Sequence, residues 1–135
     1  MKRMLALAVC VMVLCCMYVV PPAQAVLITP YFTYISTLQA GIAIIGSTAS
    51  CWGSVATSSA NDVSIKVTLL RQSGSQWVTV ASWNGYGYGI DGASVSRTYS
   101  LSIPGNYKVY SLGKILDSNG NVLEAASAYS GINTY

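Results

Sequence analysis

The segment from residue 77 to residue 88 holds the side chains that are best suited to binding chemistry. Its centre reads Trp-Asn-Gly-Tyr-Gly-Tyr, which places Trp83, Tyr86 and Tyr88 among small and polar residues. The rings of tyrosine and tryptophan present flat amphipathic faces that suit a sugar ring or a protein partner. We therefore take these three residues as candidate binding residues. Trp52 is a further candidate, because strand alternation turns it away from the face of Cys51.

Groups that could support catalysis are scarce. The chain has no histidine, so it lacks the most common general base and metal ligand. Cys51 consequently has no histidine partner, and no Ser-His-Asp arrangement can form. The acids Asp62, Asp91, Asp117 and Glu124 are single and scattered, which argues against a glycosidase pair and against an oxygen-rich calcium loop. The sequence thus predicts a protein that is not an enzyme and that needs no cofactor or metal.

Two motifs resemble ligand sites only in their spacing. Asp117, Asn119 and Asn121 alternate as in a cation-binding loop, but the glycine comes too early and no distal glutamate follows. A role in a turn explains Asp117 without a metal. The glycines over residues 87–92 have dinucleotide-binding spacing, but they open no helix and belong to no βαβ unit. We expect a turn at the first motif and a loop at the second.

The orientation of the two tryptophans over residues 77–88 stays open at this point. If the two valines of the segment face the core, Trp77 and Trp83 point outward. In the opposite orientation, both are ordinary core residues. A tryptophan beside a sandwich core is common, which favours a core position for at least one of them. Glycines weaken a strand, so we expect the flanked Tyr86 and Tyr88 on an exposed loop over residues 84–93.

The first 25 residues have the features of a signal peptide. Two basic residues precede an apolar run over residues 4–20, and Ala23 and Ala25 form an Ala-x-Ala cleavage site. We predict cleavage after Ala25, which leaves one domain over residues 26–135. The mature protein would be secreted, either free or loosely associated with the cell wall, without stable membrane insertion. The alternative is an uncleaved anchor, because the run is near the lower length limit for spanning a bilayer.

The mature chain is nearly neutral. Five basic residues oppose four acids, which leaves a net charge of +1, whereas the whole chain carries +3. Nucleic acids and acidic membranes are bound by clustered lysine and arginine, so neither is expected as a partner. The five basic residues are Lys66, Arg71, Arg97, Lys108 and Lys114.

Alternating side chains predict an all-β protein. After the signal peptide no helical period of useful length appears, and turn signals recur about every 8 to 12 residues. This pattern is typical of a single antiparallel β-sandwich, here with seven or eight short strands. Residues 31–37 and 41–45 are expected as short edge strands. The others are expected over residues 47–57, 63–69, 77–83, 95–103, 107–116 and a returning strand up to residue 129.

The turn over residues 117–120 sets the register of the last two strands. A two-residue Asn-Gly loop would pair residue 117 with 122 and place Glu124 beside Ile115. A type I turn with Gly120 in the left-handed region would pair residue 117 with 121. We predict the second register, because it leaves one mostly apolar face and a charge pair on the other. Its pairs are Ile115 with Leu123, Lys114 with Glu124, and Gly113 with Ala125.

Tyr107 carries a resemblance to known sandwiches. It follows the turn cluster Pro104-Gly105-Asn106 and precedes the apolar Val109 by two residues. This arrangement resembles the tyrosine corner of immunoglobulin-like and fibronectin type III domains. The resemblance covers about the last third of the chain, and it implies an immunoglobulin-like sandwich.

Cys51 is the one cysteine that remains after cleavage. An unpaired thiol in a secreted protein can form an intermolecular disulfide, or it can serve as a small buried hydrophobe. Ala49, Cys51, Gly53 and Val55 share one face of the expected strand. An immunoglobulin-like domain would have its second-strand cysteine there, with the partner at the position of Val109. This resemblance favours the buried state.

Four segments carry a second resemblance. They are Ala49-Ser50-Cys51, the stretch from Gln76-Trp77 to Ser82-Trp83, residues 117–124, and Thr134-Tyr135. Together they resemble a group of small secreted proteins from Gram-positive gut clostridia. This resemblance implies location and fold, and it carries no activity with it.

Two functional hypotheses follow. The first is a secreted, non-catalytic module that binds an extracellular glycan or protein through Trp52, Trp83, Tyr86 and Tyr88. The second is a structural, self-associating protein, because the chain has low charge and serine-rich strands. Its extended segment over residues 26–37 could pair with a neighbour's sheet edge. A plainer alternative makes that segment the first strand of its own sheet.

Overall fold

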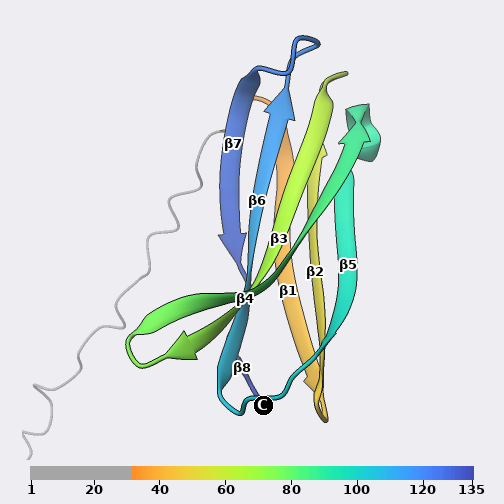
Figure 1. The fold of residues 1–135 in the computed structure, drawn as a ribbon. Helices are drawn as coiled ribbons and strands as arrows, with labels where there is room; N and C mark the ends of the chain where they lie inside the picture. The colour runs from red at the N-terminus through yellow and green to blue at the C-terminus, as the bar shows by residue number, and fades with distance from the viewer. Residues whose placement is uncertain (1–31) are drawn as a thin grey trace, which may run out of the picture. The chain divides into compact units, whose positions relative to one another are not determined.

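The computed structural model describes residues 32–135, and the predicted signal peptide with its cleavage site after Ala25 lies outside them. The described residues form eight β-strands and one short 3-10 helix (Figure 1). In chain order these are β1 (Ile35–Ile45), β2 (Thr48–Thr57), β3 (Asp62–Ser73), β4 (Gln76–Tyr88), η1 (Gly89–Asp91), β5 (Ala93–Ser100), β6 (Asn106–Leu116), β7 (Val122–Tyr129) and β8 (Asn133–Thr134).

The strands form two antiparallel sheets. One sheet has three strands in the order β1-β2-β5. The other has five, in the order β4-β3-β6-β7, with the short β8 paired to β6. Figure 1 shows the two sheets as separate layers. The prediction of an all-β antiparallel sandwich with seven or eight strands is therefore confirmed.

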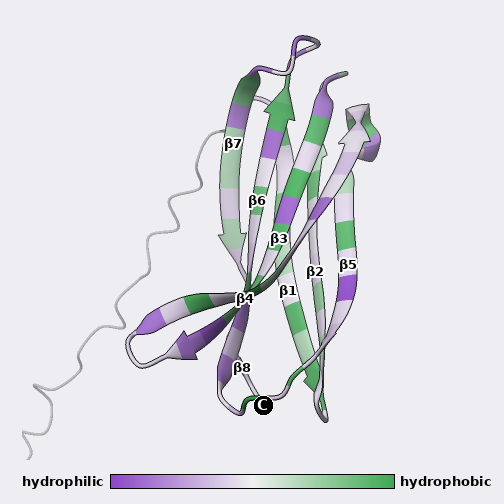
Figure 2. Cartoon of the chain, viewed as in Figure 1, coloured by the Kyte–Doolittle hydropathy of each residue, from purple (hydrophilic) through white to green (hydrophobic). Residues whose placement is uncertain are grey.

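Strand alternation builds the core between the sheets. Along β3 the inward side chains are fully buried and the intervening ones are more exposed, an alternation that Figure 2 shows as changes in hydropathy. Burying one such aliphatic side chain stabilises the fold by about 1.5–3 kcal/mol. The fully buried aliphatic residues of β3 and β6 are Val63, Ile65, Val67, Leu69, Val109 and Ile115.

The tyrosine corner is present. Tyr107 begins β6 almost completely buried, and its hydroxyl donates a hydrogen bond of 2.5 Å to the carbonyl oxygen of Ile103. Burial raises the pKa of Tyr107 above its ordinary value. The bond ties the loop between β5 and β6 to the start of β6.

Cys51 is a free and completely buried thiol, which is the alternative that the immunoglobulin-like resemblance favoured. It lies in the same hydrophobic core as Val109, the position that the tyrosine-corner spacing assigns to its partner. Desolvation by burial raises the pKa of the thiol to about 11. The reactive thiolate is therefore almost absent at neutral pH.

We expect native protein at pH 8 to resist labelling of Cys51 by a thiol reagent such as 5,5′-dithiobis(2-nitrobenzoate). Burial keeps the reagent out, and the raised pKa keeps the thiol protonated. In 6 M guanidinium chloride, the protein over residues 26–135, in which Cys51 is the one cysteine, should react with one equivalent of reagent at once. Rapid labelling of the folded protein, or a dimer that reductant dissociates, would contradict the buried position.

The boundaries of the two expected edge strands are wrong. The structure has a single β1 where two short strands over residues 31–37 and 41–45 were expected. β1 pairs with β2 from Ile35 to Ile45, with a register shift between Ile35 and Thr37. Continuous pairing along β2 keeps the intervening residues 38–40 in the strand although their own pattern is weak.

The turn after β6 has the predicted chemistry. The amide of Gly120 donates to the carbonyl of Asp117, and the amide of Asp117 donates to the carbonyl of Asn121. Gly120 has a φ of 82°, the left-handed region that glycine tolerates best. The Asp117 carboxylate accepts hydrogen bonds from the amides of Asn119 and Asn121 and from the side chain of Asn121. Its oxygens thus act within the turn.

The predicted pairing beyond that turn is wrong. A register shift lies between Ile115 and Leu116, so that Leu116 pairs with Val122 but Ile115 pairs with Glu124. The expected pairs of Ile115 with Leu123, Lys114 with Glu124, and Gly113 with Ala125 therefore do not form. The structure pairs Lys114 with Ala125 and Gly113 with Ala126. The physical reason is a one-residue bulge in β7, which turns every following side chain to the other face.

Glu124 consequently contacts the start of β1 rather than Lys114. Its carboxylate accepts hydrogen bonds from the amides of Thr33, Tyr34 and Ile35, at 2.9, 2.9 and 2.6 Å. Residues 33–35 are therefore held by the same chain, as in the plainer alternative for the extended segment. Residues 26–31 of that segment lie outside the described residues.

Candidate functional site on the outer face of the five-stranded sheet

Tyr86 and Tyr88 lie in β4 and point away from the sandwich. They pair across the sheet with Ser64 and Asp62, and their side chains are 78% and 62% exposed. The prediction of exposure is confirmed, whereas the prediction of a loop over residues 84–93 is wrong. β4 continues to Tyr88, and η1 follows it immediately.

Two glycines explain why this segment is a strand. A Cβ atom on Gly87 would lie 1.6 Å from the carbonyl oxygen of Gly92. A Cβ atom on Gly85 would lie 2.7 Å from Cγ2 of Val95 and 2.8 Å from a backbone oxygen. Both glycines therefore face the interior, where β4 approaches β5 too closely for any side chain. Because side chains alternate, the intervening Tyr86 is directed outward.

A bulge in β4 lies between Trp77 and Trp83, and the two side chains have different neighbours. Leu69 pairs with Ala81 and Leu70 with Thr79, so Val80 is an extra residue in β4. On one side of this bulge, Trp83 packs against the core, as expected for at least one tryptophan. On the other side, Trp77 contacts the ammonium group of Lys108, whose Nζ lies 4.1 Å from the ring centroid.

Trp52 lies on the other sheet. It pairs with Gly41 in β1 and Ser96 in β5, and it is 42% exposed. Its indole ring occupies the space above Gly41, where a Cβ atom would lie 2.0 Å from Cε2. The predicted binding residues thus lie in three places: Trp52 on the three-stranded sheet, Trp83 against the core, and the two tyrosines on the outer face of the five-stranded sheet. Of the predicted binding residues, the structure brings together Tyr86 and Tyr88 alone.

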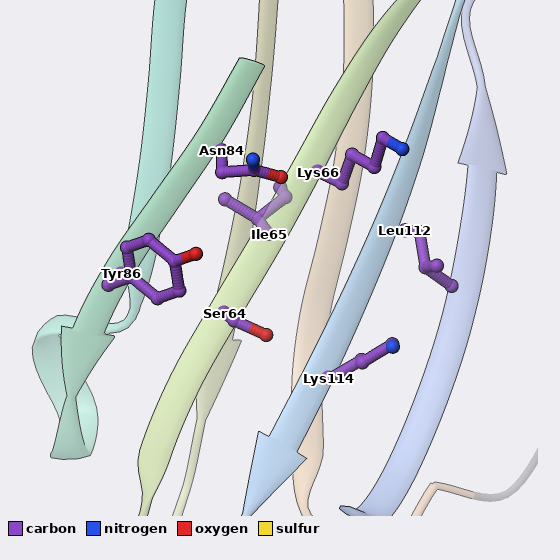
Figure 3. Close-up of a pocket in the computed structure, with 7 residues that line it drawn as sticks. All are labelled: Ser64, Ile65, Lys66, Asn84, Tyr86, Leu112 and Lys114. Atoms are coloured by element: carbon purple, nitrogen blue, oxygen red, sulfur yellow. The ribbon is translucent and has the colours of Figure 1, made fainter. Parts of the chain in front are cut away.

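A shallow depression lies beside Tyr86 on the outer face of the five-stranded sheet. Its volume is about 190 Å³. Figure 3 shows that β3, β4 and β6 each contribute side chains to it. They form two rows across the sheet, one of Tyr86, Ser64 and Lys114, and the other of Asn84, Lys66 and Leu112, with Ile65 completing the lining.

The two lysines of this depression have uncharged neighbours in the sheet. Lys66 pairs with Asn84 and Leu112. Lys114 pairs with Ser64 and Ala125. No carboxylate lines the depression among the residues that the structure describes. The site therefore offers two ammonium groups, a phenol, an amide and a hydroxyl beside the apolar side chain of Leu112.

A separate cluster of aromatic residues lies further along the same face. The Nζ atom of Lys108 lies 4.1 Å from the ring centroid of Trp77 and 4.4 Å from that of Tyr129. The rings of Tyr110 and Tyr129 are 5.0 Å apart, with an interplanar angle of 47°. A cation–π contact at an exposed site is worth about 0.5–1 kcal/mol. The charge of Lys108 is thus already engaged by its own neighbours.

Sequence reasoning missed Lys66 and Lys114 as site residues. Their alternation on β3 and β6 indicated an outward direction, but nothing local indicated that the two strands are neighbours. The predicted pairing of Lys114 with Glu124 also implied that the ammonium group of Lys114 was neutralised by a carboxylate. Strand pairing was the missing information.

A second depression adjoins Tyr88 at the end of the sheet. It has a volume of about 310 Å³ and is lined by residues of three loop or strand ends: Ala60, Asn61, Asp62, Tyr88, Asp117 and Ser118. Within residues 32–135, no three residues of the types His, Cys, Asp and Glu are grouped closely enough to hold a metal ion. The groups on this face can stack, donate hydrogen bonds and carry charge.

Comparisons with known proteins add little. No family model and no curated protein matches the sequence. A solved structure with some similarity is that of a family 76 glycoside hydrolase from a bovine Bacteroides thetaiotaomicron strain, at 11% identity and a TM-score of 0.36. The match covers 73% of this chain and 20% of that chain, and a likeness this distant carries no argument. Among the residues described, no helix has the length and apolar character needed to cross a membrane.

Proposed function

We propose that this chain is a secreted, non-catalytic module that binds an extracellular glycan on the outer face of the five-stranded sheet. The observation that carries this proposal is Tyr86, a 78% exposed ring fixed on a strand beside a polar depression. An aromatic ring offers its face to a sugar ring. The neighbouring Ser64, Asn84, Lys66 and Lys114 offer hydrogen bonds to its hydroxyl groups.

A glycan suits this face better than a protein partner. Protein–protein interfaces are depleted in lysine, and a stable one covers about 800 Å² on each partner. The depression beside Tyr86 is small, concave and contains two lysines. The self-association hypothesis has weaker support, because Glu124 holds residues 33–35 on their own chain.

The strand order supports an immunoglobulin-like arrangement for the proposed module. The sheets β1-β2-β5 and β3-β6-β7 correspond in order to strands A-B-E and C-F-G of immunoglobulin-like sandwiches. The tyrosine corner at the start of β6 lies where strand F has it. Secretion after cleavage behind Ala25 is part of the same proposal.

The test is to screen the mature protein on a glycan panel and then compare variants on any ligand found. Tyr86→Ala should weaken binding at least ten-fold, a loss of about 1.4 kcal/mol, because stacking on the ring is removed. Ile45→Ala is the matched control, since Ile45 is 82% exposed at the end of β1 on the other sheet. We expect its affinity to stay within two-fold of the original.

Trp52→Ala separates this face from the other sheet. Under the proposal, it should bind as tightly as the original protein. If Trp52→Ala abolished binding while Tyr86→Ala bound normally, the ligand would lie on the three-stranded sheet and the proposed face would be wrong.

A further inference from the structure

We propose that the depression beside Tyr86 selects an acidic glycan, with a carboxylate or sulfate group held between Lys66 and Lys114. This inference rests on the proposed function and specifies its ligand class. It is carried by two lysines that line one small depression and by the absence of a carboxylate from its described lining.

None of the four acids within residues 32–135 lines this depression, although Asp62, like Lys66, is a diagonal neighbour of Lys114 across β3 and β6. Glu124 is turned away by the bulge in β7 and accepts three backbone hydrogen bonds from residues 33–35. Asp117 accepts hydrogen bonds within its own turn. Asp62 lines the second depression, beside Tyr88 and Asp117, and Asp91 lies in η1. An anion could therefore enter the first depression without displacing an acid of the chain from its lining.

The two lysines are placed to act on one anionic group. Lys114 pairs directly with Ser64, and Lys66 is two residues further along β3. Such diagonal neighbours lie about 7–8 Å apart on one face of a sheet. Each ammonium group is a compact charge with three donors on a flexible stem, so both can converge on a carboxylate or sulfate. Figure 3 shows Lys66 extending from β3 toward β6 and Lys114 extending from β6 toward β7.

The remaining lining specifies a sugar rather than an isolated anion. Tyr86 borders the depression with an exposed ring, while Asn84 and Ser64 supply an amide and a hydroxyl for neutral hydroxyl groups. A nucleic acid is the other common polyanion, but its regularly spaced phosphates favour an extended basic surface. Here the lining contains two lysines, and the third lysine of the face, Lys108, is engaged by Trp77 and Tyr129.

The experiment is isothermal titration of the mature protein with four probes: a heparin tetrasaccharide, tetragalacturonate, neutral chitotetraose and a tetrathymidylate. We expect at least one acidic tetrasaccharide to bind ten-fold or more tightly than chitotetraose. Its affinity should fall between 50 mM and 300 mM NaCl, because salt screens exposed charges. Preference for heparin or for tetragalacturonate distinguishes sulfate from carboxylate as the bound group.

Lysine variants test which ammonium groups bind the acidic group of the ligand. Lys66→Gln and Lys114→Gln should each weaken binding of the preferred acidic probe about ten-fold and leave the thermal midpoint unchanged. Lys108→Gln is the matched control, because it removes the same charge from the same face outside the depression. We expect its affinity to stay within two-fold of the original.

The other outcomes separate this inference from the proposed function. Equal binding of chitotetraose, weakened by Tyr86→Ala but not by the Lys66 or Lys114 variants, would overturn the acidic ligand and retain the glycan-binding module. Tetrathymidylate binding as tightly as the preferred sugar would overturn the glycan class. Failure of all three sugars and of the wider panel would remove both proposals.

Discussion

Gly87→Ala should lower the free energy of unfolding by about 3 kcal/mol or more, since overpacking costs about 1–3 kcal/mol and a backbone neighbour cannot rotate away. The new Cβ atom would lie 1.6 Å from the carbonyl oxygen of Gly92 and 2.6 Å from its carbonyl carbon. Either β4 must move away from β5, or the turn around Gly92 must shift. Urea denaturation followed by tryptophan fluorescence measures the change.

The chain offers a matched control for this substitution. A Cβ atom on Gly131 would meet no heavy atom within 4 Å, and this glycine has no positive φ. We expect Gly131→Ala to change the free energy of unfolding by less than about 0.5 kcal/mol. Equal denaturation midpoints for Gly87→Ala and Gly131→Ala would show that β4 does not approach β5 as described.

Gly87→Ala also tests how Tyr86 is displayed. The inward glycines allow β4 to lie against β5, and this position directs the tyrosines outward. Under the proposed function, a shift of β4 should therefore weaken glycan binding under conditions where the variant is still folded. Lower affinity together with lower stability would show that the close packing of β4 against β5 maintains the proposed binding face.

Glu124→Gln should release the start of β1 and remove part of the acid sensitivity of the protein. The carboxylate of Glu124 accepts hydrogen bonds from the amides of Thr33, Tyr34 and Ile35. Hydrogen bonds to an ionised acceptor are about twice as strong as neutral ones. A neutral amide in the same place offers one oxygen where the carboxylate offers two, so the three donors cannot all be satisfied equally well.

The pH dependence follows from the pKa of Glu124. Burial alone would raise this pKa, but the three backbone N–H donors outweigh burial and hold it below the ordinary value of 4.5. The folded protein therefore binds this proton less readily than the unfolded chain. Its contribution to stability is complete above the ordinary pKa and is lost as the pH falls through the lowered pKa.

Hydrogen exchange and thermal melts measure both effects. At pH 6, the amides of Thr33, Tyr34 and Ile35 should exchange faster in Glu124→Gln than in the original protein, with β6 amides unchanged. Between pH 6 and pH 3, the thermal midpoint of the variant should fall less steeply. Asp91→Asn is the control, because exposed Asp91 makes none of these contacts. Unchanged exchange of the three amides in Glu124→Gln would show that the carboxylate does not hold this segment.

Local patterns in the sequence predicted much of the fold. Period-two alternation identified β3 and β6 and placed Cys51 in the core, because inward and outward side chains alternate within one strand. Turn chemistry predicted the left-handed Gly120. The spacing around Tyr107 predicted the hydrogen bond from its hydroxyl back to the preceding loop. Each of these features depends on residues that are close in the sequence.

The candidate site was predicted only in part. The exposure of Tyr86 and Tyr88 could be predicted from the glycines that flank them in the sequence. Their position in a strand could not. Glycine usually weakens a strand, and only the close approach of β5 explains why Gly85 and Gly87 are accommodated in one. That approach joins segments from different parts of the chain.

The sequence by itself determined which residues alternate, where turns form and that no histidine is present in the chain. The tertiary structure alone decided which strands are neighbours and where a bulge reverses the faces. One extra residue in β7 turned Glu124 away from Lys114, and strand pairing placed Lys66 beside Lys114. Because side chains in a strand repeat every two residues, a bulge of one residue exchanges the two faces. Long-range packing, which selects the position of that bulge, therefore left the described lining of the depression with two lysines and no carboxylate.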